Sequence, residues 1–430
     1  MRQKPGWKIK QAVLALGALV ALVAGMASTV PTAYAGGTIK ADEDKWISIG
    51  MGIRGRFSAQ ENASNDGSTY SNDFFIDNAR IYINGQLHKY IKFTFNTECF
   101  NCNVGGGAGQ FGGNSNIGLL DAILKIEYTE KFNIWAGRTL VPSERGELNG
   151  PYYHQTYLGF QTPFNSADFS GNSPSGTTGT AGGQAGLYGR DNGVVFFGKF
   201  HPGIADNPTH LLYAFMVSTG ARGSFNPGNS LMYSGRLQWN LLNDEDNPGY
   251  YTSGGYYGTA GNIIAPAINF IHQHDGAGTA LNNTDFNAFI FDFLGEYLIP
   301  GNNGVLTVNG EFKRYWAEGY NTWNEVNTTG AACFCMFGGN SWTVYALYLF
   351  PNTVGWGKFQ PYGRYTNVAP TTSALREEWE AGVNYVIDGY NARLSAFWQY
   401  GDLMTKGLNY NPNATGNRSD RFSVAFQLQY

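Results

Sequence analysis

Residues Trp46–Phe57 read WISIGMGIRGRF, and their side chains alternate between apolar and polar. The apolar side chains, which fall on one face, are Ile47, Ile49, Met51, Ile53 and Phe57. The other face carries Ser48, Gly50, Gly52, Arg54 and Arg56. Alternation over about ten residues is typical of a β-strand with one apolar and one polar face.

The same period of two recurs along the chain up to its last segment, Arg421–Tyr430, which reads RFSVAFQLQY. Between these two segments we expect strands near 73–87, 89–98, 117–128, 131–140, 187–200, 208–218, 229–241, 262–273, 284–297, 303–316, 341–350, 355–367, 375–387 and 390–401. That makes sixteen strands in all. No convincing helical period lies between them.

The connections between these strands alternate in length. Short turns lie near His88, Thr129-Glu130 and Gly389. Long connections lie at 59–72, 99–116, 141–186, 317–340 and 402–418, and the one exception is 242–261, which falls where a short turn is expected. Short turns at one rim and long loops at the other indicate an outer-membrane barrel, and an even strand count places both termini at the short-turn, periplasmic rim.

The sequence therefore predicts an all-β fold: a transmembrane, antiparallel, up-and-down β-barrel of about sixteen strands. A soluble β-sandwich rarely needs so many strands in one sheet, and a solenoid or propeller would show a fixed repeat, which is not visible. Tyr430 ends the last strand on its apolar face. A terminal aromatic of this kind resembles the assembly signal of outer-membrane barrels.

The N-terminus predicts export. Arg2, Lys4, Lys8 and Lys10 precede an apolar run, and Ala33-Tyr34-Ala35 resembles a cleavage site, so we expect residues 1–35 to be a cleaved signal peptide. Residues 36–430 would then form a single barrel domain, placed in the outer membrane of a Gram-negative cell and in contact with its lipid. Cleavage leaves 24 basic against 32 acidic residues, a net charge of −8 (24 − 32), which disfavours nucleic acid as a partner.

A barrel of this size encloses an aqueous lumen, and the polar faces predict which side chains line it. The basic pore-lining candidates are Arg54, Arg56, Arg80, Lys92, Lys125, Arg236, Lys313, Lys358, Arg364 and Arg393. The acidic ones are Glu98, Asp121, Glu127, Asp292, Glu296, Glu311, Glu378 and Glu380. The plainer interpretation, which we favour for most of them, is a solvated wall of mutually paired charges.

The connection 141–186 is the main functional candidate, because a loop of this length is rarely without a role. Its first half, 142–160, is expected to fold into the barrel and narrow it, as the third external loop of many porins does. The constriction candidates are Glu144, Arg145, Glu147, Tyr152, Tyr153 and His154. The second half, rich in Gly, Ser and Thr, is expected to be a surface loop.

Three segments resemble the phosphate-selective porin O and P family. They are Asp73–Glu98 (DFFIDNARIYINGQLHKYIKFTFNTE), Leu119–Leu148 and Gly189–Phe200, the last with its Arg-Asp-x-Gly-Val strand. The resemblance implies a trimeric, sixteen-stranded channel for small solutes, often anions, with a basic ladder for which the candidates are Arg54, Arg56, Arg80, Arg145 and Arg236. Ala79 stands where some relatives carry a second adjacent Arg. A general diffusion channel with at most a mild anion or phosphate preference is therefore the prediction.

The four cysteines fall in two expected external loops. Cys99 and Cys102 form a C-x-x-C, and Cys333 and Cys335 a C-x-C. Asn103 follows Cys102, so the motif is not C-x-x-C-H haem attachment. In an oxidising setting, local loop disulfides are expected, while a pair between loops or a metal site remains an alternative.

Two other classes of function are alternatives to a channel. A barrel can sheath a multihaem cytochrome as an electron conduit, and the sequence alone does not separate a sheath from an open pore. An outer-membrane hydrolase would need a Ser/His/acid group, but no G-x-S-x-G accompanies the six histidines. His272 and His274, in IHQHD, are expected to be polar loop residues rather than metal ligands. The prediction is a channel that is not an enzyme, with no cofactor and no metal.

Overall fold

The computed structural model describes residues 37–42, 44–64, 69–100, 116–159, 189–201, 210–220, 228–245, 247–279, 282–316, 339–371, 375–402 and 418–430. These residues form one sheet of seventeen strands and one short helix. Among them, no helix combines the length and the apolar character that a membrane crossing requires. The predicted Gly/Ser-rich half of the third loop and Cys102, Cys333 and Cys335 lie outside the described residues.

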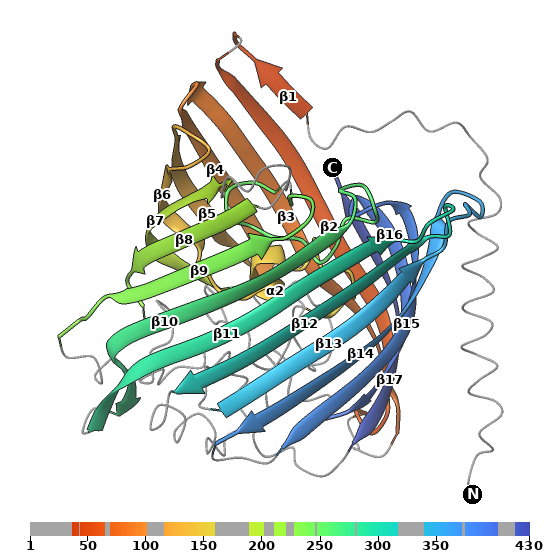
Figure 1. The fold of residues 1–430 in the computed structure, drawn as a ribbon. Coiled ribbons are helices and arrows are strands. Elements are labelled where there is room, and N and C mark those ends of the chain that lie inside the picture. The colour runs from red at the N-terminus through yellow and green to blue at the C-terminus, as the bar shows by residue number, and fades with distance from the viewer. Residues whose placement is uncertain are drawn as a thin grey trace, which may run out of the picture.

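The strands follow one another around a closed barrel (Figure 1). Their bounds are β1 Gly37–Lys40, β2 Trp46–Gln60, β3 Ser71–His88, β4 Ile91–Phe100, β5 Asn116–Glu127, β6 Asn133–Leu140, β7 Arg190–Phe200, β8 His210–Ser218, β9 Met232–Asn240, β10 Ile263–Thr279, β11 Asn282–Leu298, β12 Val305–Trp316, β13 Gly339–Leu349, β14 Lys358–Pro370, β15 Arg376–Asp388, β16 Ala392–Gly401 and β17 Ser419–Gln429. Each strand from β2 to β17 pairs antiparallel with the next, and β17 pairs with β2.

The predicted fold class is confirmed, with two elements that the sequence pattern missed. Removing β1 from the seventeen strands leaves the sixteen of the closed barrel (17 − 1). The short strand β1 pairs only with the first residues of β2, from Gly37↔Ile49 to Lys40↔Trp46. The second element is α2, Arg145–Asn149, which lies inside the ring of strands (Figure 1). One turn of helix is too short to show a period in the sequence.

The two faces of each strand meet different surroundings. On β2, Ile49 and Met51 are 46% and 62% exposed on the outside, whereas Arg54 and Ser58 are buried inside. On β10, outward Phe270 alternates with the buried Asn269 and Ile271. An apolar exterior around a polar interior is the pattern of a barrel that sits in lipid.

The interior of the barrel is filled by the chain itself. Two connections enter it from opposite rims: residues 141–159 between β6 and β7, and residues 244–259 between β9 and β10. Buried Val141 and Leu148 of the first share one apolar cluster with Tyr250 of the second and Trp135 of β6. Gly249 (φ +63°) is required there, because a Cβ at this position would lie 2.5 Å from the Trp135 ring.

The outward face yields a first prediction. Phe270 lies near the middle of β10 with 56% of its surface exposed. Phe270→Arg is expected to lower the free energy of unfolding by about 2–4 kcal/mol, because a charge at mid-membrane depth contacts lipid. Phe270→Leu, which keeps the surface apolar, is the control. The measurement is reversible urea unfolding in lipid vesicles; equal stability of the two variants would show that this face does not contact hydrocarbon.

Candidate functional site: the constriction inside the barrel

The inward part of the third loop is anchored where it leaves β6. It leaves β6 at Val141, whose N–H donates to the Gly189 carbonyl at 2.9 Å. Helix α2 follows Glu144 and ends at Gly150, which has φ +58°, a conformation that glycine adopts without steric cost. The segment 141–152 therefore consists of one turn of helix and its flanking loop, packed within the barrel.

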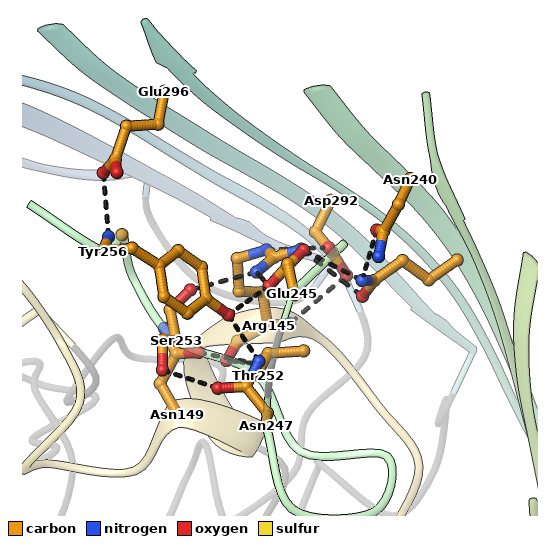
Figure 2. A network of polar contacts seen from close by, with 12 residues as sticks. Arg145, Asn149, Asn240, Glu245, Asn247, Thr252, Ser253, Tyr256, Asp292 and Glu296 are labelled. Atoms are coloured by element: carbon orange, nitrogen blue, oxygen red, sulfur yellow. Dashed lines mark hydrogen bonds and ion pairs between the residues drawn. The ribbon is translucent and has the colours of Figure 1, made fainter. Parts of the chain in front are cut away.

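Arg145 is the centre of this body (Figure 2). Its side chain is fully buried and forms a two-pronged ion pair with Glu245, at 2.7 and 2.8 Å. Its Nη1 also donates to the Ser253 carbonyl at 3.0 Å, and its Nε lies 3.5 Å from Asp292 Oδ1. Glu245 and Ser253 belong to the 241–262 connection, so one guanidinium joins the two inward-folded segments to the wall strand β11.

The second segment makes further contacts on both sides (Figure 2). Thr252 Oγ1 donates to the Arg145 carbonyl at 3.1 Å and to Asn149 Oδ1 at 2.6 Å. Tyr256 donates its N–H to Glu296 Oε2 and its hydroxyl to Glu245 Oε2, both at 2.8 Å. The sequence singled out 242–261 only as a connection of unexpected length. Its role is to meet the third loop within the lumen.

Charged side chains of β12, the neighbour of β11, and of β16 also hold the third loop. Lys313 pairs with Glu144 at 2.6 Å, and Glu311 accepts a hydrogen bond from the Gly146 N–H at 2.6 Å. Arg393 Nη1 donates to the carbonyls of His154 and Gln155, each at 2.9 Å. Removing one partner from a buried pair leaves an uncompensated charge, so these contacts hold the loop in one position.

Most of the remaining predicted pore-lining residues are also engaged. Arg56 pairs with Asp77, Arg80 with Glu98, Lys92 with Glu127, Arg236 with Asp292, and Arg364 with Glu378 and Glu380. Arg54 donates to Asn78 Oδ1 and to the Tyr157 carbonyl. Among these basic side chains, Arg54, Arg80, Arg236 and Arg364 are buried, whereas Arg56 and Lys92 are partly exposed. The ladder candidates therefore bind neighbouring carboxylates and loop carbonyls.

Two predicted basic residues differ from this pattern. Lys125 Nζ lies 4.0 Å from the centre of the Trp135 ring, a cation–π contact. Within the described part of the chain, neither Lys125 nor Lys358 has a carboxylate at ion-pair distance. Both line the space that the inward segments leave open.

That space lies toward the short-turn rim of the barrel. A cavity of about 710 Å³ is bounded by β3–β5, by the end of α2, by the 247–259 segment and by the turns that follow β13 and β15. A second cavity of about 690 Å³ shares Lys125 and Asn247 with it and reaches the short turn at Thr129 and Glu130. The charged side chains that line the first cavity are Arg80, Lys125, Arg190, Lys358, Asp121 and Asp388.

The predicted constriction residues lie inside the barrel. Glu144, Arg145, Glu147, Tyr152 and His154 are buried, whereas Tyr153 is 45% exposed and lines the larger cavity. Burial, together with nearby Glu144, raises the pKa of Glu147 well above its ordinary value. Burial, with Arg364 and Arg393 nearby, lowers the pKa of His154 well below its ordinary value. Both shifts favour the neutral side chain.

Sequence reasoning missed Glu245 and Arg190. Arg190 pairs with Asp121 at 3.0 Å and lines the cavity, and the Arg-Asp-x-Gly-Val segment was its only signal. Cys99 is disulfide-bonded. Because Cys102, Cys333 and Cys335 lie outside the described residues, the predicted local pairing stays a prediction.

Comparison with known proteins gives structural neighbours only. No protein-family model and no curated protein matches the sequence. OprB of Pseudomonas putida is 8% identical and covers 89% of this chain and 94% of its own, with a TM-score of 0.53. An anion-selective porin from Comamonas acidovorans is 11% identical and covers 90% and 100%, with a TM-score of 0.50. The fold is thus an outer-membrane porin-type β-barrel.

The joint between the two inward segments gives a second prediction. Glu245→Gln removes the carboxylate from a buried ion pair, a change that costs about 3–5 kcal/mol in such pairs. The third loop should loosen, and single-channel conductance in a planar bilayer should rise and become noisier. Asp244→Asn, next to it but paired with Lys199 at the rim, is the control. Unchanged conductance in Glu245→Gln would show that the joint does not limit the passage.

Proposed function

We propose that this chain is an outer-membrane channel through which small hydrophilic solutes diffuse passively. The observation that carries the proposal is a pair of neighbouring cavities inside the barrel, which share the lining residues Lys125 and Asn247 and extend to the short-turn rim. An apolar outer surface around such a passage suits a membrane-spanning pore. The inward segments set the width of the passage.

The proposal also covers the export, the membrane location and the oligomeric state of the protein. Residues 1–35 act as a signal peptide, and residues 36–430 form one domain in the outer membrane of a Gram-negative cell. The short-turn rim faces the periplasm, and the channel assembles as a homotrimer, as the resemblance to the porin O and P family implies. The chemistry requires no catalytic group and no cofactor.

A mild anion preference is the finer part of the proposal. Four basic and two acidic side chains line the larger cavity, an excess of two positive charges (4 − 2). Arg80 and Arg190 are paired with Glu98 and Asp121. Without these two pairs, the lining keeps Lys125 and Lys358 against Asp388, an excess of one positive charge (2 − 1). A phosphate-specific ladder needs arginines that are free to bind the anion, and the ladder candidates are engaged elsewhere.

The cytochrome sheath fits the interior less well. A sheath must leave its lumen open to a second, haem-bearing chain, whereas residues 141–159 and 244–259 cross this lumen and bind each other and the wall. We therefore keep the channel as the proposal, and co-purification of a multihaem cytochrome with the barrel would reverse that choice.

The first experiment is single-channel recording of the refolded protein in a planar bilayer with a salt gradient. Discrete steps with a small anion-signed reversal potential are the expected result. Steps without selectivity would leave a general channel and remove the anion preference. Absence of conductance from a correctly folded barrel would overturn the channel itself.

A third prediction concerns the source of the selectivity. Lys125→Glu reverses one charge in the cavity, and should abolish or invert the anion-signed reversal potential, because unpaired charges in a narrow passage dominate its field. Lys45→Glu, at an exposed position outside the cavity beside Asp42, is the matched control and should leave the potential unchanged. An equal shift in both variants would show that the selectivity arises from overall charge.

A further inference from the structure

The proposed channel assigns no role to the IHQHD motif, Ile271–Asp275. It lies in β10, which with β11 forms a hairpin of two 17-residue strands closed at the long-loop rim. His272 and His274 follow outward-facing Phe270 at intervals of two residues, and all three side chains are exposed. The motif therefore lies on the outer face of the barrel beyond the middle of the strand.

A β-bulge brings an acid from the neighbouring strand to this motif. Pairing is regular up to Gln273↔Phe286 and resumes at Ala277↔Thr284. Three residues of β10, 274–276, thus lie opposite the single residue Asp285 of β11. Asp275, within the bulge, has φ +53°. Bulges often redirect a side chain in this way, and here one imidazole and two carboxylates converge.

The three side chains lie close enough together to reach one ion. His274 Nδ1 lies 2.7 Å from Asp285 Oδ1, and His274 Nε2 lies 3.5 Å from Asp275 Oδ2. One ligand atom from each of the three residues lies within 4.8 Å of the other two. Zinc–nitrogen and zinc–oxygen bonds of about 2.0–2.2 Å place tetrahedral ligands about 3.3 Å apart. Because His274 is 68% exposed, its ring can rotate to close the site without repacking.

We propose that His274, Asp275 and Asp285 bind one divalent transition-metal ion of the zinc class, with water completing its coordination. Two carboxylates balance the charge of the ion. Imidazole selects Zn²⁺, Ni²⁺ or Cu²⁺ over Mg²⁺ and Ca²⁺, which prefer oxygen ligands alone. The site is separate from the cavities and does not depend on the channel.

The test is isothermal titration of Zn²⁺ into the purified, detergent-solubilised barrel at neutral pH. No reductant is added, because free thiolates would also bind zinc. The expected result is one ion per chain, with binding at least tenfold weaker in His274→Ala and in Asp285→Asn. His88→Ala, an exposed histidine at the opposite rim, should bind as the parent does. Millimolar Mg²⁺ or Ca²⁺ should not compete.

Two results would overturn the proposal. Absence of zinc binding by the parent protein would leave His274 as an ordinary ion-pair partner of the two aspartates. Binding that His274→Ala and Asp285→Asn do not weaken, or that His88→Ala weakens equally, would place the ion elsewhere. Circular dichroism of each variant shows whether the barrel is intact, and Asp285→Asn tests the site if His274→Ala fails to fold.

Discussion

The rest of this structure depends on closure of the sheet. In hydrocarbon no water is available to the backbone, so each N–H and C=O must find its partner within the protein. The closure is made by β17 and β2, paired from Arg421↔Gln60 to Gln429↔Gly52. Beyond that register, Tyr430 and Met51 exchange both backbone hydrogen bonds at 2.8 Å. Once the cylinder is closed, alternation fixes one face to lipid and the other to the lumen.

A closed barrel of this size creates a second requirement, because wall side chains alone cannot fill it. The chain supplies two connections from opposite rims, and the wall charges hold them. A buried charge without a partner lowers the stability of the fold. The buried Lys313 pairs with Glu144, and the buried Arg145 pairs with Glu245. The polar face that the sequence displays as pore lining is thus largely the binding surface for the protein's own loops. The space that remains lies between the inward segments, β3–β5 and the turns that follow β13 and β15.

The sequence predicts the barrel well because its signal is local. A period of two marks each strand from its own residues, and the alternation of connection lengths gives the topology. The inward half of the third loop was also predicted, from likeness to the third loop of porins and from the contrast in composition between its two halves. The pairs that fix it were not, because Arg145 and Glu245 are 100 residues apart in the chain and meet only when both connections have entered the lumen. Strand β1 and helix α2 are too short to show a period in the sequence. The unusual length of 242–261 indicated that this connection differs from the other short turns, but not that it enters the lumen.

The same arginines cannot both hold the third loop and form an anion ladder. A ladder works when each guanidinium gives up water and binds the passing ion in its place. Here Arg80, Arg145 and Arg236 already have carboxylate partners, and Arg54 donates to the Tyr157 carbonyl. An anion would have to displace a buried carboxylate, which would then be left unpaired at a cost of several kcal/mol. In the proposed channel, pairing of the wall would leave the width of the passage, together with Lys125 and Lys358, as the main determinant of what crosses it.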